Sequence, residues 1–553
     1  MRHTVNALAA LLLASSATPA LADTLVTNVN GIQVDATGKV ERFTSVLVGD
    51  DGKVKRLLHG ELLKLRDAKV FDAGGRTMLP GLIDAHGHVM GLGFSALQLD
   101  LTGTRSVAEL QAKLKMYAAR NPNARWILGR GWNQELWAEK RFPTAADLDA
   151  VVSDRPVWLG RVDGHAAVAN SAALKAAGIT AETKAPEGGQ IENGLFVDAA
   201  MNLVEPKIPA PRPEEYDAAL LKAQELMLST GLTAAADMGT SPDDWAAMNR
   251  AGEAGKLNVR IMNYAGGIPA MQAINGGKPS DWLYGDRLHL GGVKLYDDGA
   301  LGSRGAWLKS PYHDKPDTRG LQFHTDEQIL EQARHAASEG FQVAIHAIGD
   351  AANAQVVSTY EKLGQLHKGD RRWRIEHVQV IDPADIPRLR SAGIIASMQP
   401  THQTSDRTMA EARLGQDRLA GAYAWQTIAR AGVPLAFGSD FPVESPNPFP
   451  GIAAAVSRQD MSGQPPGGWR PEERVSFEQA VHGFTRGAAF AGYAESKIGS
   501  LDPGAYADFI LVDRDVSKVD PQALARTQVL ETWVAGRKVW QRAPSGAPAE
   551  RGR

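Results

Sequence analysis

The stretch GLIDAHGHVMGLG, residues 81–93, decides how the rest of the sequence is interpreted. Its apolar residues predict a buried strand, and His86 and His88 lie two positions apart within it. Alternate residues of a strand point to the same face, so the two imidazoles lie side by side, and Asp84 shares that face. Either the two histidines bind one metal ion, or they are two polar groups in a core.

Around this stretch, short apolar strands alternate with amphipathic helices, which is typical of βαβ units and a parallel sheet. Eight strands are expected, the number found in a (β/α)8 barrel. We expect them at 82–88, 233–238, 259–264, 291–296, 342–347, 374–380, 394–399 and 434–439. The sequence therefore predicts an α/β fold with a TIM-like barrel over residues 81–497.

Two further parts are expected beside the barrel. Residues 100–220 follow the first barrel strand and contain strand-like pieces, WILGRGW and PVWLGRVDGH. They are too long and too patterned for a loop, so we expect an insertion packed over the mouth of the barrel. Residues 23–80 and 498–545 alternate apolar and polar residues around turn signals, which predicts a small β-sandwich formed by both ends of the chain. The tail 546–553 is expected to be disordered.

Composition limits the classes of function. The 553 residues include 60 Lys and Arg and 63 Asp and Glu, a net charge of −3, with no basic stripe that would indicate nucleic acid. The chain has no cysteine, which excludes disulfides, thiolate metal ligands and a cysteine nucleophile. It lacks the glycine motifs of nucleotide-binding loops and the G-x-S-x-G motif of serine hydrolases.

The first residues are similar to an export signal. Arg2 and His3 precede an apolar stretch over 5–14, and Ala20-Leu21-Ala22 offers a small-x-small cleavage site. We expect residues 1–22 to be removed after Ala22, leaving a periplasmic or secreted protein without membrane contact. The alternative is an uncleaved anchor or a buried first helix, although the stretch is too short to span a bilayer.

Polar residues that could carry chemistry fall at the ends of the expected strands. These residues are His86, His88, Lys294, His346, His377 and Asp440. Barrel active sites form at the C-terminal ends of the strands, so residues far apart in sequence converge on one rim. Imidazole and carboxylate groups are ligands for zinc or a similar divalent ion. The histidine pair is therefore interpreted as metal ligands.

The same residues indicate a chemistry. A bound metal lowers the pKa of its water toward about 7, and Asp440 could take that proton and pass it to a leaving nitrogen. If Lys294 is buried, it can lose its proton and react with carbon dioxide, giving a carbamate that bridges two metals. Singly, His346 or His377 could be a core histidine, Asp440 a turn cap and Lys294 a salt-bridge partner. The joint pattern favours one or two ions, with Zn²⁺ the expected metal.

At these residues the sequence resembles the amidohydrolase superfamily. LPGLIDAHGHV matches its first-strand signature, the order His-x-His, Lys, His, His, Asp matches its metal set, and KIGSLDPGAYADFILVD is similar to a strand of its sheet domain. More narrowly, the chain resembles amidohydrolase family 3, the group related to YtcJ and N-substituted formamide deformylase. The stretches that carry this likeness are LGRGWNQELW, RVDGHAAVANSAAL, VKLYDDGALGSRGAWL, HAIGDAAN, IEHVQV and FGSDFPVESPNPF.

The resemblance implies a metal-dependent hydrolase of carbon–nitrogen bonds other than peptide bonds. It implies metal ligation by His86, His88, His346, His377, a carboxylated Lys294 and Asp440, with Asp440 also the catalytic base. The substrate would be a small molecule with an amide, N-formyl, N-acyl or cyclic amide group, attacked by metal-bound hydroxide. The family's lysine motif commonly reads DGSLGSRTA. Ala300 and Gly305 depart from it here, so the substrate of a relative is not carried over.

Further residues are candidates for substrate binding, namely Trp132, Asp163, His165, Asp298, Arg304 and His402. The first three belong to the insertion and could close over the substrate, or Trp132 is a core residue and Asp163 a turn residue. Asp298 and Arg304 could meet a substrate carboxylate, anchor their loop or form a structural salt bridge. His402 could donate to a substrate carbonyl or face solvent.

Two other functions stay open. A lactonase or phosphotriesterase-type hydrolase would use the same attack without protonating a leaving nitrogen. A secreted binding protein would keep the barrel without the chemistry. The presence of all the rim residues favours an enzyme. A homodimer would be ordinary for such a protein.

Overall fold

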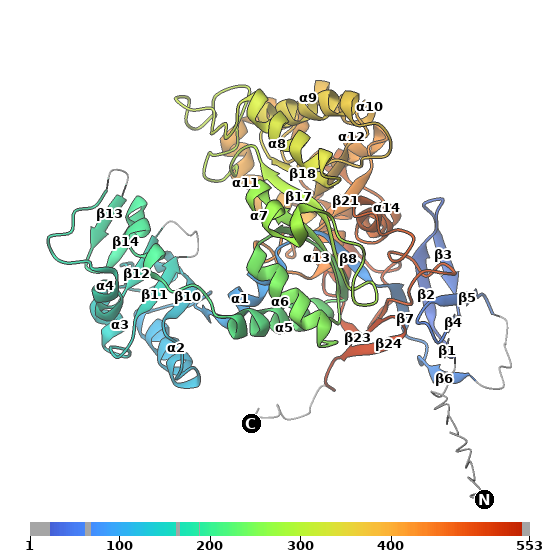
Figure 1. Cartoon of the computed structure of the whole chain (residues 1–553), viewed down its shortest axis with the longest axis horizontal. Helices are drawn as coiled ribbons and strands as arrows, with labels where there is room; N and C mark the ends of the chain where they lie inside the picture. Colours follow the sequence, from blue (N-terminus) through green and yellow to red (C-terminus); the bar gives the residue numbers. More distant parts are fainter. Residues whose placement is uncertain (1–22, 61–67, 162–165, 187–188, 545–553) are drawn as a thin grey trace, which may run out of the picture.

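The computed structural model describes residues 23–60, 68–161, 166–186 and 189–544. The expected signal peptide over 1–22 and the expected disordered tail over 546–553 lie outside these residues. Figure 1 shows a barrel in the middle of the molecule, a separate α/β insertion on one side and layered β-sheets on the other.

The barrel is a parallel sheet of eight strands. Its strands are β8 (Leu82–Gly87), β15 (Leu232–Thr240), β16 (Arg260–Gly266), β17 (Leu288–Tyr296), β18 (Gln342–Ala347), β19 (Arg374–His377), β20 (Ile395–Met398) and β21 (Leu435–Phe437). Each strand pairs with the next in this order. The predicted TIM-like barrel is therefore confirmed.

The first and last strands are joined by contacts just beyond the ladder. Asp440 N donates to His86 O at 2.7 Å, and His88 N donates to Phe441 O at 2.8 Å. The Asp84 carboxylate accepts from Ser439 N at 3.0 Å and from Ser439 Oγ at 2.6 Å. Asp84, which shares β8 with His86, thus closes the barrel.

Two candidate residues stand where the backbone turns sharply. His377 has a φ of 80° and Val378 a φ of 47°, so β19 ends at His377, before the end of the expected strand 374–380. Asp440 has a φ of 60°. Residues other than glycine that adopt this left-handed region cost free energy, and such residues concentrate at functional sites.

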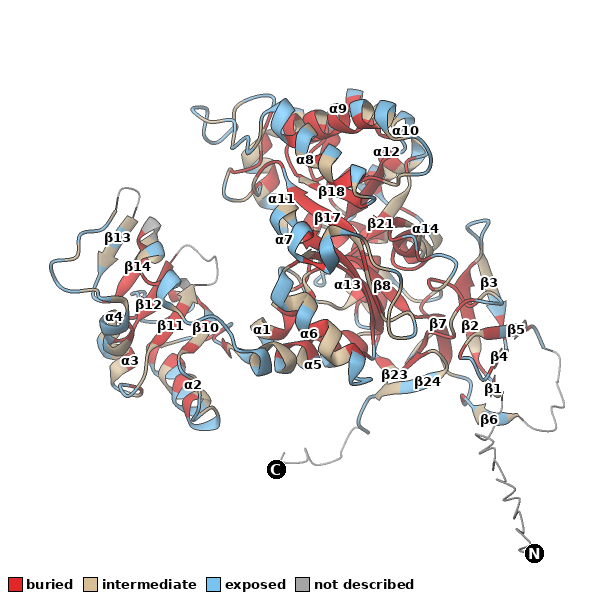
Figure 2. Ribbon diagram, viewed as in Figure 1, coloured by how far each residue is buried: buried red, intermediate tan, exposed pale blue. Residues whose placement is uncertain are grey.

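Helices surround the barrel, and Figure 2 shows their buried sides turned toward the strands. They are α1 (Val89–Leu97), α5 (Pro213–Ser229), α6 (Pro242–Glu253), α7 (Gly267–Ala273), α8 (Asp326–Ser338), α9 (Asp350–Leu366), α10 (Ile386–Ser391), α11 (Pro400–Leu414), α12 (Trp425–Arg430), α13 (Pro448–Ser457), α14 (Phe477–Gly483), α15 (Arg486–Ala491) and α16 (Pro521–Ala525). Within the described residues, none of the helices combines the length and apolar character needed to cross a bilayer.

Two sheets fit the expected small sandwich: one is built from N-terminal strands alone, and the other combines strands from both ends of the chain. One has the order β5-β4-β1-β6, and the other β24-β23-β22-β7-β2-β3. Their bounds are β1 (Thr24–Thr27), β2 (Asn30–Val34), β3 (Val40–Phe43), β4 (Ser45–Val48), β5 (Val54–Leu58), β6 (Lys69–Asp72), β7 (Thr77–Pro80), β22 (Phe509–Val512), β23 (Val529–Val534) and β24 (Arg537–Gln541). A shared core includes Val46, Phe43, Phe509 and Trp533.

The insertion forms its own sheet, in the order β13-β14-β12-β11-β10-β9. Its elements are β9 (Leu99–Asp100), α2 (Val107–Arg120), β10 (Ile127–Trp132), α3 (Ala145–Asp149), β11 (Val157–Arg161), β12 (Ala166–Ala169), α4 (Ser171–Ala177), β13 (Gly189–Glu192) and β14 (Leu195–Asp198). It packs around cores of its own, and one of them holds Trp132 and Trp137.

The position of the insertion differs from the expectation. We expected residues 100–220 to cover the barrel mouth, but Figure 1 shows them beside the barrel, next to α1 and α5. None of their described residues lines the cavity at the mouth. Because the insertion buries its apolar residues in its own cores, it does not need the barrel surface to complete them.

Candidate metal centre

A cavity of about 380 Å³ opens at the C-terminal ends of the barrel strands. All six predicted metal-site residues line it, and so does His402. The remaining lining residues are Tyr296, Ala300, Leu301, Gly302, Ile348, Gln379, Ser405, Asp406, Met409, Val443 and Glu444. Residues from position 86 to position 444 thus meet in one place, as expected for a barrel rim.

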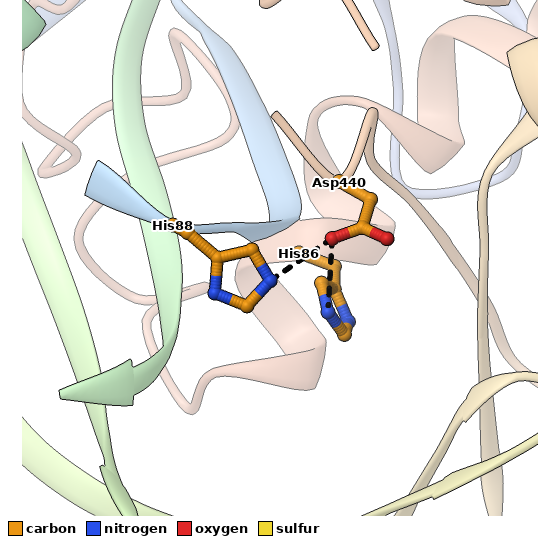
Figure 3. A group of neighbouring side chains, drawn as sticks. All are labelled: His86, His88 and Asp440. Carbon is orange, nitrogen blue, oxygen red and sulfur yellow. Dashed lines mark ion pairs between the residues drawn. The ribbon is translucent and has the colours of Figure 1, made fainter. Parts of the chain in front are cut away.

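Asp440 faces both His86, in β8, and His88, which follows β8 and precedes α1, as Figure 3 shows. Its Oδ1 is 3.0 Å from His88 Nε2 and 3.6 Å from His86 Nε2. One ligand atom from each of these three residues lies within 4.8 Å of the others. His86 is fully buried, whereas the His88 side chain is one-third exposed at the cavity.

A second group shares the same carboxylate. His377, His402 and Asp440 also bring their ligand atoms within 4.8 Å of one another. His402 Nε2 lies 3.8 Å from Asp440 Oδ2, and the rings of His377 and His402 are stacked with centroids 6.1 Å apart. His346 is adjacent, because its ring centroid is 4.6 Å from that of His377. Asp440 is therefore common to both groups.

Buried partners orient two of the imidazoles. His86 Nδ1 lies 2.6 Å from Glu376 Oε2, and Arg374 holds Glu376 through Nε and Nη2 at 2.7 and 3.1 Å. His377 Nδ1 lies 2.9 Å from Gln399 Oε1. When Nδ1–H donates to such an oxygen, the lone pair of Nε2 is left for a ligand. These contacts select the tautomer that a metal-binding histidine needs.

The pKa shifts at the site favour the protonation states that a metal ion needs. Burial and the neighbouring Lys294 lower the pKa of His86 to about 4. Burial and the adjacent His346 and His86 lower the pKa of His377 well below its usual value. Burial alone would raise the pKa of Asp440, but the surrounding imidazoles hold it well below its ordinary value. Neutral imidazoles and an ionised carboxylate are the forms that bind a cation.

Lys294 is buried at the inner end of the cavity. Its Nζ lies 3.3 Å from His86 Nε2 and 4.7 Å from the Tyr296 ring centroid. Burial lowers the pKa of Lys294 to about 8, although Glu376 and Asp440 oppose this change. A lysine amine with such a pKa is unprotonated in a substantial fraction of molecules near neutral pH, and that form reacts with carbon dioxide.

The donors fit a divalent cation. Asp440 Oδ1, His346 Nε2 and His402 Nε2 are buried but make no hydrogen bond of acceptable geometry within the described residues. Buried polar atoms in proteins are normally paired, and each exception needs an explanation. A divalent cation held by nitrogen and oxygen donors would satisfy atoms of this kind.

Three of the residues predicted to bind substrate do not line the cavity. Trp132 is buried inside the insertion and donates from Nε1 to Leu159 O at 2.7 Å. Asp298 accepts from the backbone N–H groups of Trp307, Ile348 and Gly349, so it anchors its loop. Arg304 pairs with Asp314 at 2.8 Å and does not line the cavity.

Two predicted residues, Asp163 and His165, lie outside the described residues. His402, expected either at the substrate or in solvent, is buried at the cavity. Of the six candidates for substrate binding, it is the one that the described structure places there.

Some residues of the site were not anticipated from the sequence, above all Glu376 and Arg374. Both are fully buried in β19. Two opposite charges at alternate positions of an apolar strand, as in RIEHVQV, could have indicated a buried pair on the face that turns toward the histidines. Gln399, Asp406 and Glu444 carried no such signal, because single polar residues in helices and loops are common.

The chain matches a known family and is similar to known proteins over most of its length. A sequence model described as the amidohydrolase family matches residues 69–540. The chain is 33% identical to the amidohydrolase YtcJ of Bacillus subtilis, over 90% of this chain and 96% of that protein. It is 28% identical to the N-substituted formamide deformylase of Arthrobacter pascens, over 93% of this chain and 97% of that protein.

A solved structure is also similar. An uncharacterized metal-dependent hydrolase from Pyrococcus horikoshii superposes with a TM-score of 0.78 at 27% identity. The superposition covers 90% of this chain and 99% of that one. Together with the sequence match, which includes every residue of the candidate metal centre, this likeness extends over nearly the whole described chain.

Proposed function

Because the chain belongs to the amidohydrolase family, we propose that it hydrolyses a non-peptide carbon–nitrogen bond of a small-molecule amide, N-formyl, N-acyl or cyclic amide. The motif resemblance to this family is confirmed, and metal-dependent hydrolases share the fold. The observation that carries the proposal is the single carboxylate of Asp440, which is shared by two groups of histidines at one cavity.

We propose that one or two Zn²⁺ ions would be held by His86, His88, His346, His377 and Asp440, with a carbamate on Lys294 as a further ligand. Nitrogen and oxygen donors of this kind suit zinc. Such a cation supplies Lewis acidity toward a carbonyl oxygen and lowers the pKa of a coordinated water.

The chain's own residues would then handle the proton. Asp440 Oδ1, held ionised among imidazoles, accepts a proton from the attacking water and returns it to the leaving nitrogen. Glu376 and Gln399 keep His86 and His377 in the tautomer whose Nε2 faces the cavity. Unprotonated Lys294 would add carbon dioxide and release one proton, which gives a carbamate whose single negative charge is shared by two oxygens.

The metal content tests this assignment first. Elemental analysis of the full protein, purified without chelator, should give close to two metal ions per chain, lost in the His86→Ala/His88→Ala variant. A content near one would leave Lys294 outside the ligand set. No metal in the wild-type protein, even after reconstitution with zinc, would refute the proposal.

A second test addresses the base. Asp440→Asn should lower turnover of any accepted amide by about 10²–10⁴-fold, the usual worth of a positioned acid–base group. Asp417→Asn is the matched control, because Asp417 is exposed and does not line the cavity. Full activity of the Asp440 variant would remove Asp440 as the base.

We also propose that the protein is exported and cleaved after Ala22, as the first residues suggest. The mass of the protein recovered from the periplasm or medium tests this. A mature chain that begins at Asp23 is expected, and an intact N-terminus on the recovered protein would contradict the cleavage.

A further inference from the structure

The cavity contains two carboxylates that the proposed chemistry does not use. Asp406 lies on α11, and Glu444 follows β21. Both line the cavity together with the metal-site residues. They belong to one acidic wall, which we define as Ser405, Asp406 and Glu444. Its residues lie close together, since Ser405 Oγ donates to Glu444 Oε1 at 2.6 Å.

Helix α11 brings this wall to the metal centre. His402, Ser405, Asp406 and Met409 follow one another at spacings of three, one and three residues, and all four line the cavity. Residues three and four apart lie on the same face of a helix. Asp406 is therefore one turn away from His402, whose Nε2 is buried, unpartnered and part of the second histidine group.

The acidic wall has no lysine or arginine partner within the described part of the chain. Asp406 Oδ2 accepts from the Tyr423 hydroxyl at 2.8 Å, a neutral donor, and Glu444 accepts from a serine. Apart from Lys294 at the inner end of the cavity, no described arginine or lysine lines it.

Three arginines from the segments that line the cavity are engaged elsewhere. Arg304 and Arg413 both pair with Asp314, and Arg407 pairs with Asp460 at 3.2 Å. The earlier idea that Arg304 receives a substrate carboxylate therefore has no support in the structure. A substrate carboxylate in this cavity would meet two like charges and no free cation at the wall.

We propose that the cavity selects amides that also carry a positively charged ammonium or guanidinium group, held between Asp406 and Glu444. The apolar part of the substrate would lie along Tyr296, Leu301 and Met409, and its amide would face the metal centre. This inference rests on the proposed amide hydrolysis and adds the substrate's charge to it. A cation between two unpaired carboxylates gains charge-assisted hydrogen bonds, whereas an anion there is repelled.

Three compounds of matched length test the charge preference. The cation is N-(3-aminopropyl)formamide, the neutral compound is N-butylformamide, and the anion is 4-formamidobutanoate. The corresponding acetamide of each is tested as well. For the metal-loaded enzyme we expect kcat/KM to be at least about tenfold higher for the cation than for the neutral compound, and lowest for the anion. Tenfold corresponds to about 1.4 kcal/mol.

The acidic wall is tested with the Asp406→Asn/Glu444→Gln double variant and with Asp417→Asn as a surface control that removes one charge away from the cavity. The ratio of kcat/KM for the cation over the neutral compound should fall about tenfold in the double variant and stay unchanged in the control. Equal kcat/KM for cation and neutral compound in the wild-type enzyme would overturn the inference while leaving amide hydrolysis intact. A preference that survives the double variant would overturn it as well.

If none of the compounds is hydrolysed, amide hydrolysis of this kind fails, and binding still decides the inference. Isothermal titration calorimetry with the same compounds should then show tighter binding of the cation in the wild-type protein, lost in the double variant. Equal affinity for cation and neutral compound would overturn the inference.

Discussion

Glu376 is the residue whose removal should reveal most about how the metal centre is held. It is fully buried between Arg374 and His86, and it pairs with both. Glu376→Gln keeps the shape of the side chain and removes its charge. The glutamine amide accepts hydrogen bonds only through its single oxygen, so its NH₂ group faces an N–H donor of either Arg374 or His86.

The cost can be worked from these contacts. Removing one partner of a buried ion pair costs about 3–5 kcal/mol, because the other charge is left without compensation. Arg374 keeps hydrogen bonds to Ala85 O at 2.6 Å, Ser397 Oγ at 2.9 Å and Tyr264 Oη at 3.0 Å. We therefore expect the lower end of the range, about 3 kcal/mol.

Urea unfolding of the metal-free protein measures this loss. With an m-value of about 3 kcal/mol per molar, a loss of about 3 kcal/mol lowers the midpoint by about 1 M. Glu361→Gln is the matched control, since its pair with Arg388 is 38% and 35% exposed and should be worth at most about 1 kcal/mol. Its midpoint should fall by no more than about 0.3 M.

Metal affinity is the second readout. Partners that orient a metal-binding histidine are worth about 10- to 100-fold in affinity, so zinc should bind that much more weakly to Glu376→Gln than to wild type. Glu361→Gln should bind zinc like wild type. If both variants unfold at the same urea concentration and bind zinc equally, Glu376 does not hold His86, and the reasoning is wrong.

Three further predictions concern other parts of the molecule. Lys294→Ala should lower the metal content from two ions toward one or none, and short carboxylic acids should partly restore it. Lys518→Ala, at an exposed lysine, should leave the metal content unchanged. An unchanged metal content in Lys294→Ala would exclude a ligand role for Lys294. Burial alone would raise the pKa of Asp515, but hydrogen bonds from Ser517, Asn30 and Arg42 hold this pKa below the ordinary value of 3.8. The stabilisation by Asp515 is therefore present above about pH 4 and is lost as the pH falls. Asp515→Asn should thus destabilise the protein by about 2 kcal/mol at pH 7, and thermal unfolding should show this difference vanish under acid conditions; a difference independent of pH would contradict the assignment. Trp132→Ala should cost about 3–5 kcal/mol within the insertion and speed proteolysis between residues 100 and 220, with metal content unchanged; lost metal would instead show that the insertion supports the centre.

The sequence allowed the barrel and its rim to be predicted because both rest on regular patterns. Buried parallel strands are nearly continuous apolar runs, so a histidine, lysine or aspartate at a strand end stands out. His86, His346 and Asp440 could be recognised in this way, and the fold brings them to one cavity.

Other features depend on contacts that periodicity does not encode. The insertion buries its apolar residues in hydrophobic cores of its own. Its residue pattern therefore does not predict where it lies relative to the barrel mouth. Arg304 lies close to Lys294 in sequence, but Asp314 engages it. Asp406 and Glu444 come from separate elements, and only the folded chain shows that they share a wall.

The closure of the barrel has a consequence for the order of events during synthesis. His86 leaves the ribosome more than 350 residues before Asp440, and Asp84 and Ser439, which close the ring, are separated by 355 residues. The sheet that contains β2 and β7 likewise waits for β22, β23 and β24. Contacts so distant in sequence form late, after the intervening chain is available. A chain that stops before residue 440 therefore lacks the carboxylate common to both histidine groups, and we expect the proposed metal to be loaded only after residue 440 has been synthesised.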